Sequence, residues 1–349
     1  MENPDSKPPR RVRYKGTHPK TFKDKYKELQ PERYAADIEK VLQKGYTPAG
    51  MHRSICVNEI MDFLNVQPGQ VGMDATLGYG GHSLEILKAL NHQGKLYATD
   101  VDPLELPRTK ERLEKQGFGE ADVVIKKMNF AGLDLIVEEA GLLNFILADL
   151  GVSSMQIDNP ERGFSLKVDG PLDLRLNPYN GKSAARLLEN ISQQKLEELL
   201  IENSDEPYAD VIAEAIIKTI KSGGKIQTTT QLKDCIKEAL DFFPASESKD
   251  MIKKSCQRTF QALRIEVNDE FGVLNAFLQK LPDALDEGGK VAILSFHSGE
   301  DRRVKKAFQA FYRQGVYSEI SPEPIRPSPE EVASNPRARS AKLRWAIKA

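Results

Sequence analysis

The spacing of apolar and polar positions changes along the chain and divides it into predicted strands and helices. Short apolar runs predict four strands in the first half, at 71–75, 95–99, 123–127 and 144–149. Between the strands, apolar residues recur three and four positions apart, as in segment 83–90 and in the segment after Asp102-Pro103. Strands that alternate with helices are typical of βαβ units, which build a parallel sheet.

The next run with strand character, 290–296, begins about 140 residues after the fourth strand. A connection within a parallel sheet normally needs one helix and a few loop residues. The intervening segment has helical spacing at 184–191 and 211–216, and 257–281 resembles a helix that returns to the sheet. We therefore predict an α/β fold in which a Rossmann-like sheet is interrupted by an inserted helical domain. The predicted bounds are 46–160 and 256–349 for the sheet domain and 161–255 for the insert.

Charge is distributed unevenly in a chain of otherwise ordinary composition. The 349 residues are 40% hydrophobic and 29% charged, with a net charge of −1, as in many folded proteins. Residues 7–27 contain nine lysines and arginines against one acid, and residues 302–349 contain eleven against four. Two basic ends on an acidic body indicate a polyanionic partner, with solvated basic surfaces as the alternative. Residues 1–45 are predicted to form a basic, flexible extension.

Several classes of protein are not expected from this sequence. No apolar stretch approaches the roughly 18 residues of a membrane helix, so we expect no membrane partner and a cytoplasmic protein. The three cysteines, Cys56, Cys235 and Cys256, form no Cys-x-x-Cys pair, which argues against a disulfide framework and a zinc site. The histidines have no metal-ligand spacing either, and we expect no metal.

A glycine-rich turn, Gly78-Tyr79-Gly80-Gly81-His82, follows the first predicted strand. In doubly wound folds this turn borders the ligand crevice, and glycine lets the main chain approach a ligand closely. The dinucleotide fingerprint requires glycine or alanine where Ser83 stands. Asp74 suits the ammonium group of S-adenosyl-L-methionine, and Asp100, which ends the second strand, can accept both ribose hydroxyls. The turn therefore predicts an S-adenosylmethionine site, with a nicotinamide cofactor as the alternative.

Six further motifs follow in the rest of the chain: DLGVSS at 149–154, RGFS at 162–165, DGPLDLR at 169–175, RTFQALRI at 258–265, SFHS at 295–298 and NPRARS at 335–340. In this order they closely resemble the MraW/RsmH family of bacterial small-subunit ribosomal RNA methyltransferases, over about residues 46–349. The resemblance implies a class I methyltransferase sheet and S-adenosylmethionine as cofactor. It also implies N4-methylation of a cytidine in the decoding centre of 16S rRNA on the small ribosomal subunit.

The resemblance further implies which residues contact the cofactor. Besides Asp74, the predicted cofactor-binding residues are Gly80, Gly81, His82, Asp100, Phe130, Asp149 and Gln156. We also predict a catalytic role for Asp149: its side chain, or the main-chain carbonyl beside it, accepts a hydrogen bond from the target amine. The alternative is that Asp149 only caps the turn that follows it.

Other roles and functions stay open at the level of sequence. Met155, Gly299 and the N-terminal extension depart from the family pattern, which allows a paralogue that methylates another RNA or DNA cytosine. A non-catalytic rRNA-binding assembly factor is a second alternative.

The oligomeric state stays open between a monomer and a homodimer. His297 either orients the base or a phosphate, or bonds to the next loop. Arg162, Asp173 and Arg175 either clamp RNA or cover the cofactor, or they form an internal salt-bridge network that fixes the insert. Phosphate contact is predicted for Arg302, Arg303, Lys305, Lys306, Arg337, Arg339 and Arg344.

Overall fold

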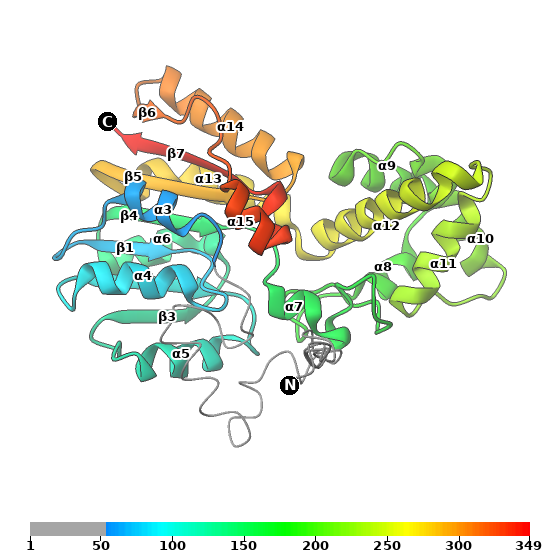
Figure 1. Ribbon diagram of the computed structural model, residues 1–349, viewed down its shortest axis with the longest axis horizontal. Helices are drawn as coiled ribbons and strands as arrows, with labels where there is room; N and C mark the ends of the chain where they lie inside the picture. The colour runs from blue at the N-terminus through cyan, green and yellow to red at the C-terminus, as the bar shows by residue number, and fades with distance from the viewer. Residues whose placement is uncertain (1–53) are drawn as a thin grey trace, which may run out of the picture. The chain divides into compact units, whose positions relative to one another are not determined.

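A seven-stranded sheet forms the centre of the sheet domain in this computed structural model, which describes residues 54–349 (Figure 1). The predicted extension, 1–45, lies outside the described residues. The strands follow the order β3-β2-β1-β4-β5-β7-β6. Their bounds are β1 Val71–Asp74, β2 Lys95–Asp100, β3 Val123–Lys127, β4 Leu143–Asp149, β5 Leu285–Ser295, β6 Tyr317–Ile320 and β7 Lys342–Lys348.

The first five strands are parallel, and β7 runs antiparallel to both β5 and β6. This arrangement confirms the predicted Rossmann-like methyltransferase sheet. The strand order reverses between β1 and β4, which is the topological switch point where doubly wound sheets bind ligands. Asp74 and Asp149 end these two strands, and Asp100 ends β2 on the other side of β1. The three acids therefore meet at the carboxyl edge of the sheet.

Helices cover both faces of the sheet, because the central strands are apolar on both sides. Along β4, Phe145 and Leu147 pack into one buried cluster and Ile146 and Ala148 into the other, with the period of two expected of a strand. The first cluster includes residues of α3 (Val57–Leu64), α4 (Gly81–Leu90) and α5 (Leu106–Lys115). The second includes residues of α6 (Leu133–Ala140), α13 (Glu270–Ala284) and α14 (Ser298–Arg313).

The insert is helical, as predicted, and has a buried cluster of its own. The chain reaches it from β4 through α7 (Ser154–Asp158) and the 3₁₀ turn η3 (Pro160–Arg162). Its helices are α8 (Ala184–Asn190), α9 (Gln193–Ser204), α10 (Ala209–Lys221), α11 (Thr229–Ala239) and α12 (Ala245–Asn268). Figure 1 shows these helices on the right, beyond the ends of the parallel strands.

The predicted helix over 257–281 is two helices in the structure. Asp269 has φ of 48°, a left-handed conformation that ends α12 and starts α13. The buried cluster of the insert extends along α12 to Leu263. We therefore propose that the insert ends near Asp269 rather than at residue 255.

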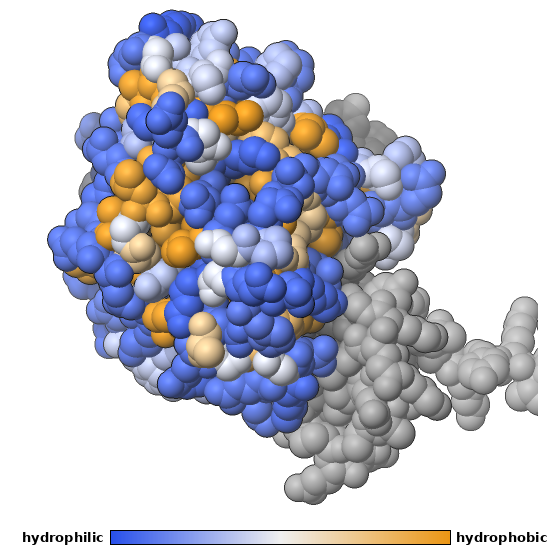
Figure 2. Space-filling view, turned by 90° about the vertical axis from the view of Figure 1, so that its left-hand side faces the viewer, coloured by the Kyte–Doolittle hydropathy of each residue, from blue (hydrophilic) through white to orange (hydrophobic). Residues whose placement is uncertain are grey.

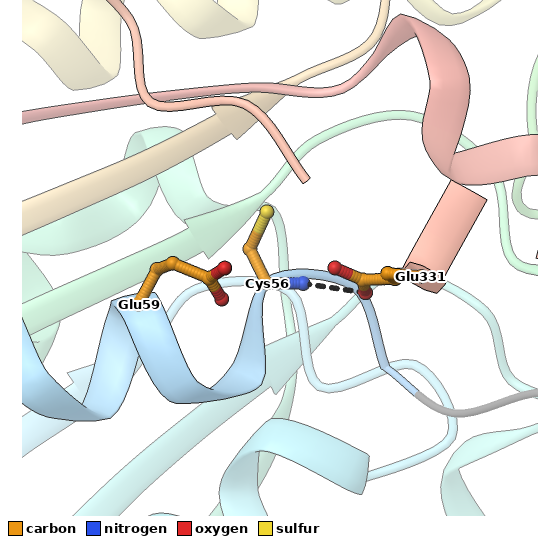
Figure 3. Close-up of side chains that lie close together, drawn as sticks. All are labelled: Cys56, Glu59 and Glu331. Atoms are coloured by element: carbon orange, nitrogen blue, oxygen red, sulfur yellow. Dashed lines mark hydrogen bonds between the residues drawn. The ribbon is translucent and has the colours of Figure 1, made fainter. Parts of the chain in front are cut away.

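The C-terminal segment returns to the start of the described chain. Glu331, in α15 (Pro329–Ser334), accepts a hydrogen bond from the main-chain N–H of Cys56 over 2.9 Å (Figure 3). The 3₁₀ turn η4 (Pro336–Ser340) then leads into β7. The face of the sheet domain turned away from the insert is mainly hydrophilic, with groups of hydrophobic residues between (Figure 2). Among the described helices, none combines the length and the apolar character needed to cross a bilayer.

Candidate active site

The glycine turn after β1 has a backbone that only glycine accommodates without strain. Gly78 and Gly80 have φ of 46° and 80°, in the left-handed region. A Cβ on Gly80 would lie 2.8 Å from the Thr109 side chain, and one on Gly81 would lie 2.0 Å from the Ser54 hydroxyl oxygen. The turn is thus closely packed against Thr109 and Ser54, and it leads directly into α4.

Asp100 ties this turn to the end of β2. Its Oδ2 accepts the N–H of Gly78 over 2.7 Å, and its Oδ1 accepts the N–H of Asp102 over 2.9 Å. Each carboxylate oxygen can accept a second bond, so the side chain retains room for the two ribose hydroxyls. Burial raises the pKa of Asp100 to about 6, against the lowering effect of these two bonds.

Asp74 is only 1% exposed and makes its contacts inside the protein. Its Oδ2 accepts the Ser83 hydroxyl over 2.6 Å, and its Oδ1 accepts the N–H of Thr76 over 3.0 Å. Ser83, whose presence in the sequence argued against a dinucleotide cofactor, is therefore the hydrogen-bond partner of Asp74. The predicted contact of Asp74 with a cofactor ammonium stays a prediction.

His82 and Asp149 face each other across the switch point. The Nδ1 of His82 lies 3.5 Å from Oδ2 of Asp149, and its Nε2 lies 2.9 Å from the carbonyl oxygen of Ile55. An Nε2–H that donates to Ile55 leaves Nδ1 of His82 as the ring atom that faces the Asp149 carboxylate. Burial raises the pKa of Asp149 to about 6.

The two carboxylate oxygens of Asp149 differ in their contacts. Its Oδ1 is buried and has no hydrogen-bond partner among the described residues. A buried carboxylate oxygen without a donor is costly, because it has lost water and gained no partner. The main-chain N–H of Asp149 donates to the Thr76 hydroxyl oxygen over 2.6 Å, which fixes this strand end beside the turn.

Phe130 and Gln156 occupy the remaining predicted positions. Phe130 is half-buried after β3, in the 3₁₀ turn η2 (Phe130–Gly132), and its ring contacts Phe277 edge to face at 5.0 Å. Gln156 is buried and completes a capping box with Ser153 at the start of α7. Its Nε2 donates to Asp102 Oδ2 over 2.8 Å. Direct contact of either residue with a cofactor stays a prediction.

Three residues that support the turn were not predicted from sequence. Thr109 donates its hydroxyl to the carbonyl of Gly78 over 2.7 Å, and the guanidinium of Arg112 donates to the carbonyl of Tyr79. Both come from α5, whose polar residues carry no sequence signal for this contact. The third residue, Asp102, acts through Asp100, to which its N–H donates, and its position two residues after Asp100 was a sequence signal that could have been used.

The structure shows internal salt bridges for the arginines of the insert motifs. Arg162 pairs with Asp102, and Arg175 pairs with Asp173 over 2.6 Å. Two C-terminal arginines are also paired. Arg337 lies 2.8 Å from Asp158, and Arg344 is 4% exposed and lies 2.6 Å from Asp301. The prediction that Arg344 contacts phosphate is therefore wrong, because the side chain is buried in an ion pair.

Two groups of side chains in the described part of the chain bring potential metal ligands within 4.8 Å of one another. They are Glu270 with His297 and Glu300, and Cys56 with Glu59 and Glu331 (Figure 3). In the first group, Arg264 already binds both oxygens of Glu270 over 2.7 and 2.8 Å. In the second, burial raises the pKa of the Cys56 thiol to about 12, which disfavours the thiolate that binds metals. We assign neither group to a metal.

Comparison with known proteins gives consistent matches over most of the chain. Residues 49–349 match the model of a family described as the MraW methylase family. "Ribosomal RNA small subunit methyltransferase H 2" of Alkaliphilus metalliredigens is 66% identical over 349 residues, covering 100% of both chains. "Ribosomal RNA small subunit methyltransferase H 1" of Lachnoclostridium phytofermentans is 63% identical, covering 100% of this chain and 95% of that protein. "Ribosomal RNA small subunit methyltransferase H" of Prochlorococcus marinus is 41% identical, covering 85% and 94%.

Proposed function

The chain belongs to the MraW methylase family, and from this premise we propose that it methylates the exocyclic N4 of a cytidine in the decoding centre of 16S rRNA. It is an S-adenosylmethionine-dependent enzyme. The observation that carries the proposal is the meeting of Gly78–His82, Asp100 and Asp149 at the switch point of the sheet. We place the enzyme in the cytoplasm, acting on the small ribosomal subunit or a late precursor.

The residues at the switch point fit this cofactor. Bound there, S-adenosylmethionine supplies an electrophilic methyl group attached to a sulfonium. The glycine turn offers main chain without side chains, and Asp100 offers acceptor positions for ribose hydroxyls. The Oδ1 of Asp149 needs a donor and has none among the described residues.

Asp149 is the residue we propose to act on the substrate. The N4 lone pair of cytosine is delocalised into the ring, which makes the amine a poor nucleophile. A hydrogen bond from N4–H to the Asp149 carboxylate would draw electron density back onto nitrogen and would orient the amine for methyl transfer. The amine would give up a proton on transfer, and the Asp149 carboxylate, with His82 Nδ1 at 3.5 Å, would be the group that takes it.

A second candidate is a paralogue that methylates another RNA or DNA cytosine, which the departures from the family pattern at Met155 and Gly299 allow.

The decisive experiment is in vitro methylation followed by mass spectrometry of 16S rRNA fragments. Small subunits purified from cells without this gene are incubated with the protein and S-adenosylmethionine. We expect N4-methylcytidine in the fragment that contains the decoding centre. Methylation of another nucleotide would support the paralogue, and RNA binding without methylation would support an assembly factor. Fragments from cells with and without the gene give the matching comparison in vivo.

A further inference from the structure

A buried ion pair joins the insert to the cofactor edge of the sheet. The Nη1 of Arg162 lies 2.7 Å from the Oδ2 of Asp102, with side chains 5% and 0% exposed. Removing both charges from water is costly, so a buried ion pair is weak evidence for a gain in stability. Its geometry, which fixes the position of both partners, is the more informative property.

On the sheet side, Asp102 controls the conformation of the turn after β2. Its Oδ1 accepts the N–H of Leu104 over 2.9 Å, and its Oδ2 accepts Gln156 Nε2 as well as Arg162. Its own N–H donates to Oδ1 of Asp100. The orientation of Asp100 therefore depends on where Asp102 is held.

On the insert side, Arg162 bonds the loop 174–176, which contacts both chain connections between the sheet domain and the insert. Its Nη2 donates to the carbonyls of Arg175 and Leu176 over 3.1 and 2.7 Å. Asn268, the last residue of α12, bonds the same loop through the carbonyl of Leu174 and the N–H of Leu176. Leu174 has φ of 65°, a strained conformation for leucine that these bonds hold in place.

We propose that Asp102 and Arg162 are positioning residues for the cofactor, through which the insert sets the orientation of Asp100 toward the ribose. The continuous path runs from loop 174–176 through Arg162 and Asp102 to Asp100. The inference rests on the proposed cofactor and not on the identity of the RNA target. It has a reciprocal consequence, since a ligand that orders the insert also strengthens cofactor binding.

Calorimetric titration of the full chain with S-adenosylhomocysteine tests the proposal. We expect Asp102→Asn and Arg162→Lys to weaken binding about tenfold or more, since a tenfold change corresponds to about 1.4 kcal/mol. Arg186→Met is the matched control, because it removes an ion pair with Glu189 from the insert without touching loop 174–176 or the turn after β2. It should bind within about twofold of the wild type.

A second pair of measurements separates positioning from folding. Thermal unfolding without ligand reports any loss of stability, and steady-state kinetics should show a raised KM for S-adenosylmethionine with kcat retained at saturation. Wild-type affinity in folded Asp102→Asn and Arg162→Lys proteins would overturn the proposal. Failure of the wild type itself to bind S-adenosylhomocysteine would instead overturn the cofactor assignment.

Discussion

The main-chain N–H of Gly78 donates to Oδ2 of Asp100 over 2.7 Å, which joins the turn after β1 to the end of β2. The same carboxylate is the proposed acceptor of the ribose hydroxyls. It must be ionised to serve both, because a protonated oxygen is a weaker acceptor. Burial, which raises its pKa to about 6, places this ionisation close to neutral pH.

Cofactor affinity should therefore fall as the pH is lowered through about 6, by up to about tenfold per pH unit for each group that titrates. Asp100→Asn should bind weakly at all pH values and should lose this part of the pH dependence. Calorimetry with S-adenosylhomocysteine between pH 5 and 8 measures both effects. A wild-type affinity that is flat over this range would contradict the role of Asp100.

Protein stability should respond to the same ionisation with the opposite sign. The pKa of Asp100 is higher in the folded chain than in the unfolded chain, so the folded state holds the proton more tightly between about pH 4 and 6. The contribution of Asp100 to the free energy of unfolding is thus present below about pH 4 and is lost as the pH rises to 6. Urea unfolding of the wild type and of Asp100→Asn without cofactor should show this difference.

Asp149→Ala should slow methyl transfer about 100-fold or more, because the proposed acceptor for the target amine is removed. Asp149→Asn keeps an oxygen acceptor, so its rate of methyl transfer should lie between the rates of the wild type and of Asp149→Ala. Asp134→Ala is the matched control, since Asp134 is an aspartate on α6 with a side chain 55% exposed. Single-turnover rates and cofactor affinity are measured together. A wild-type rate for Asp149→Ala with normal cofactor affinity would exclude the catalytic role.

Sequence predicted most of the sheet because its strands carry a strong local signal. Strand β3 has the predicted ends, and β1, β2 and β4 differ by about one residue. Strand β5 begins at Leu285, five residues before the predicted start. The residues between, Asp286 to Gly289, are acids and glycines without apolar side chains. Strand β6 was not predicted because it is short and has two polar residues in succession, Ser318 and Glu319. Strand β7 alternates basic and apolar residues over 342–345, a strand signal that could have been used.

The partners of the site residues could not be predicted, because they come from distant parts of the chain. The N–H of Asp149 donates to Thr76, 73 residues away, and Asp102 bonds Arg162, 60 residues away. The break between α12 and α13 was missed for another reason. Asn268-Asp269 is a turn signal, but the apolar spacing of helices continues on both sides of it.

Gly72 allows β1 to pack against a ring of the neighbouring strand. A Cβ at this position would lie 2.2 Å from the ring of Phe145. Gly72→Ala should therefore lower the free energy of unfolding by about 1–3 kcal/mol through overpacking. Gly119→Ala is the matched control, since nothing lies within 4 Å of its added Cβ, and it should change stability by about 0.5 kcal/mol or less. Urea unfolding measures both, and Gly72→Ala with Phe145→Leu should recover part of the loss.

We expect two groups of basic residues in the C-terminal segment: residues that contact RNA and residues that stabilise the fold. Lys306 and Arg339 are exposed, so reversing both charges should weaken RNA binding and reduce the slope of log affinity against log salt by about 0.7–0.9 per lost phosphate contact. Lys115→Glu, a charge reversal on α5, is the control and should leave the slope unchanged.

Arg344 should behave differently, because it is buried beside Asp301. Arg344→Met leaves that carboxylate with Lys342 as its remaining cation, and should lower stability while the folded protein keeps the wild-type salt slope. Fluorescence titrations of a 16S rRNA fragment at several salt concentrations distinguish the two groups. An unchanged slope in the Lys306→Glu, Arg339→Glu double variant would show that RNA binds elsewhere, because these two charges would then neutralise no phosphate.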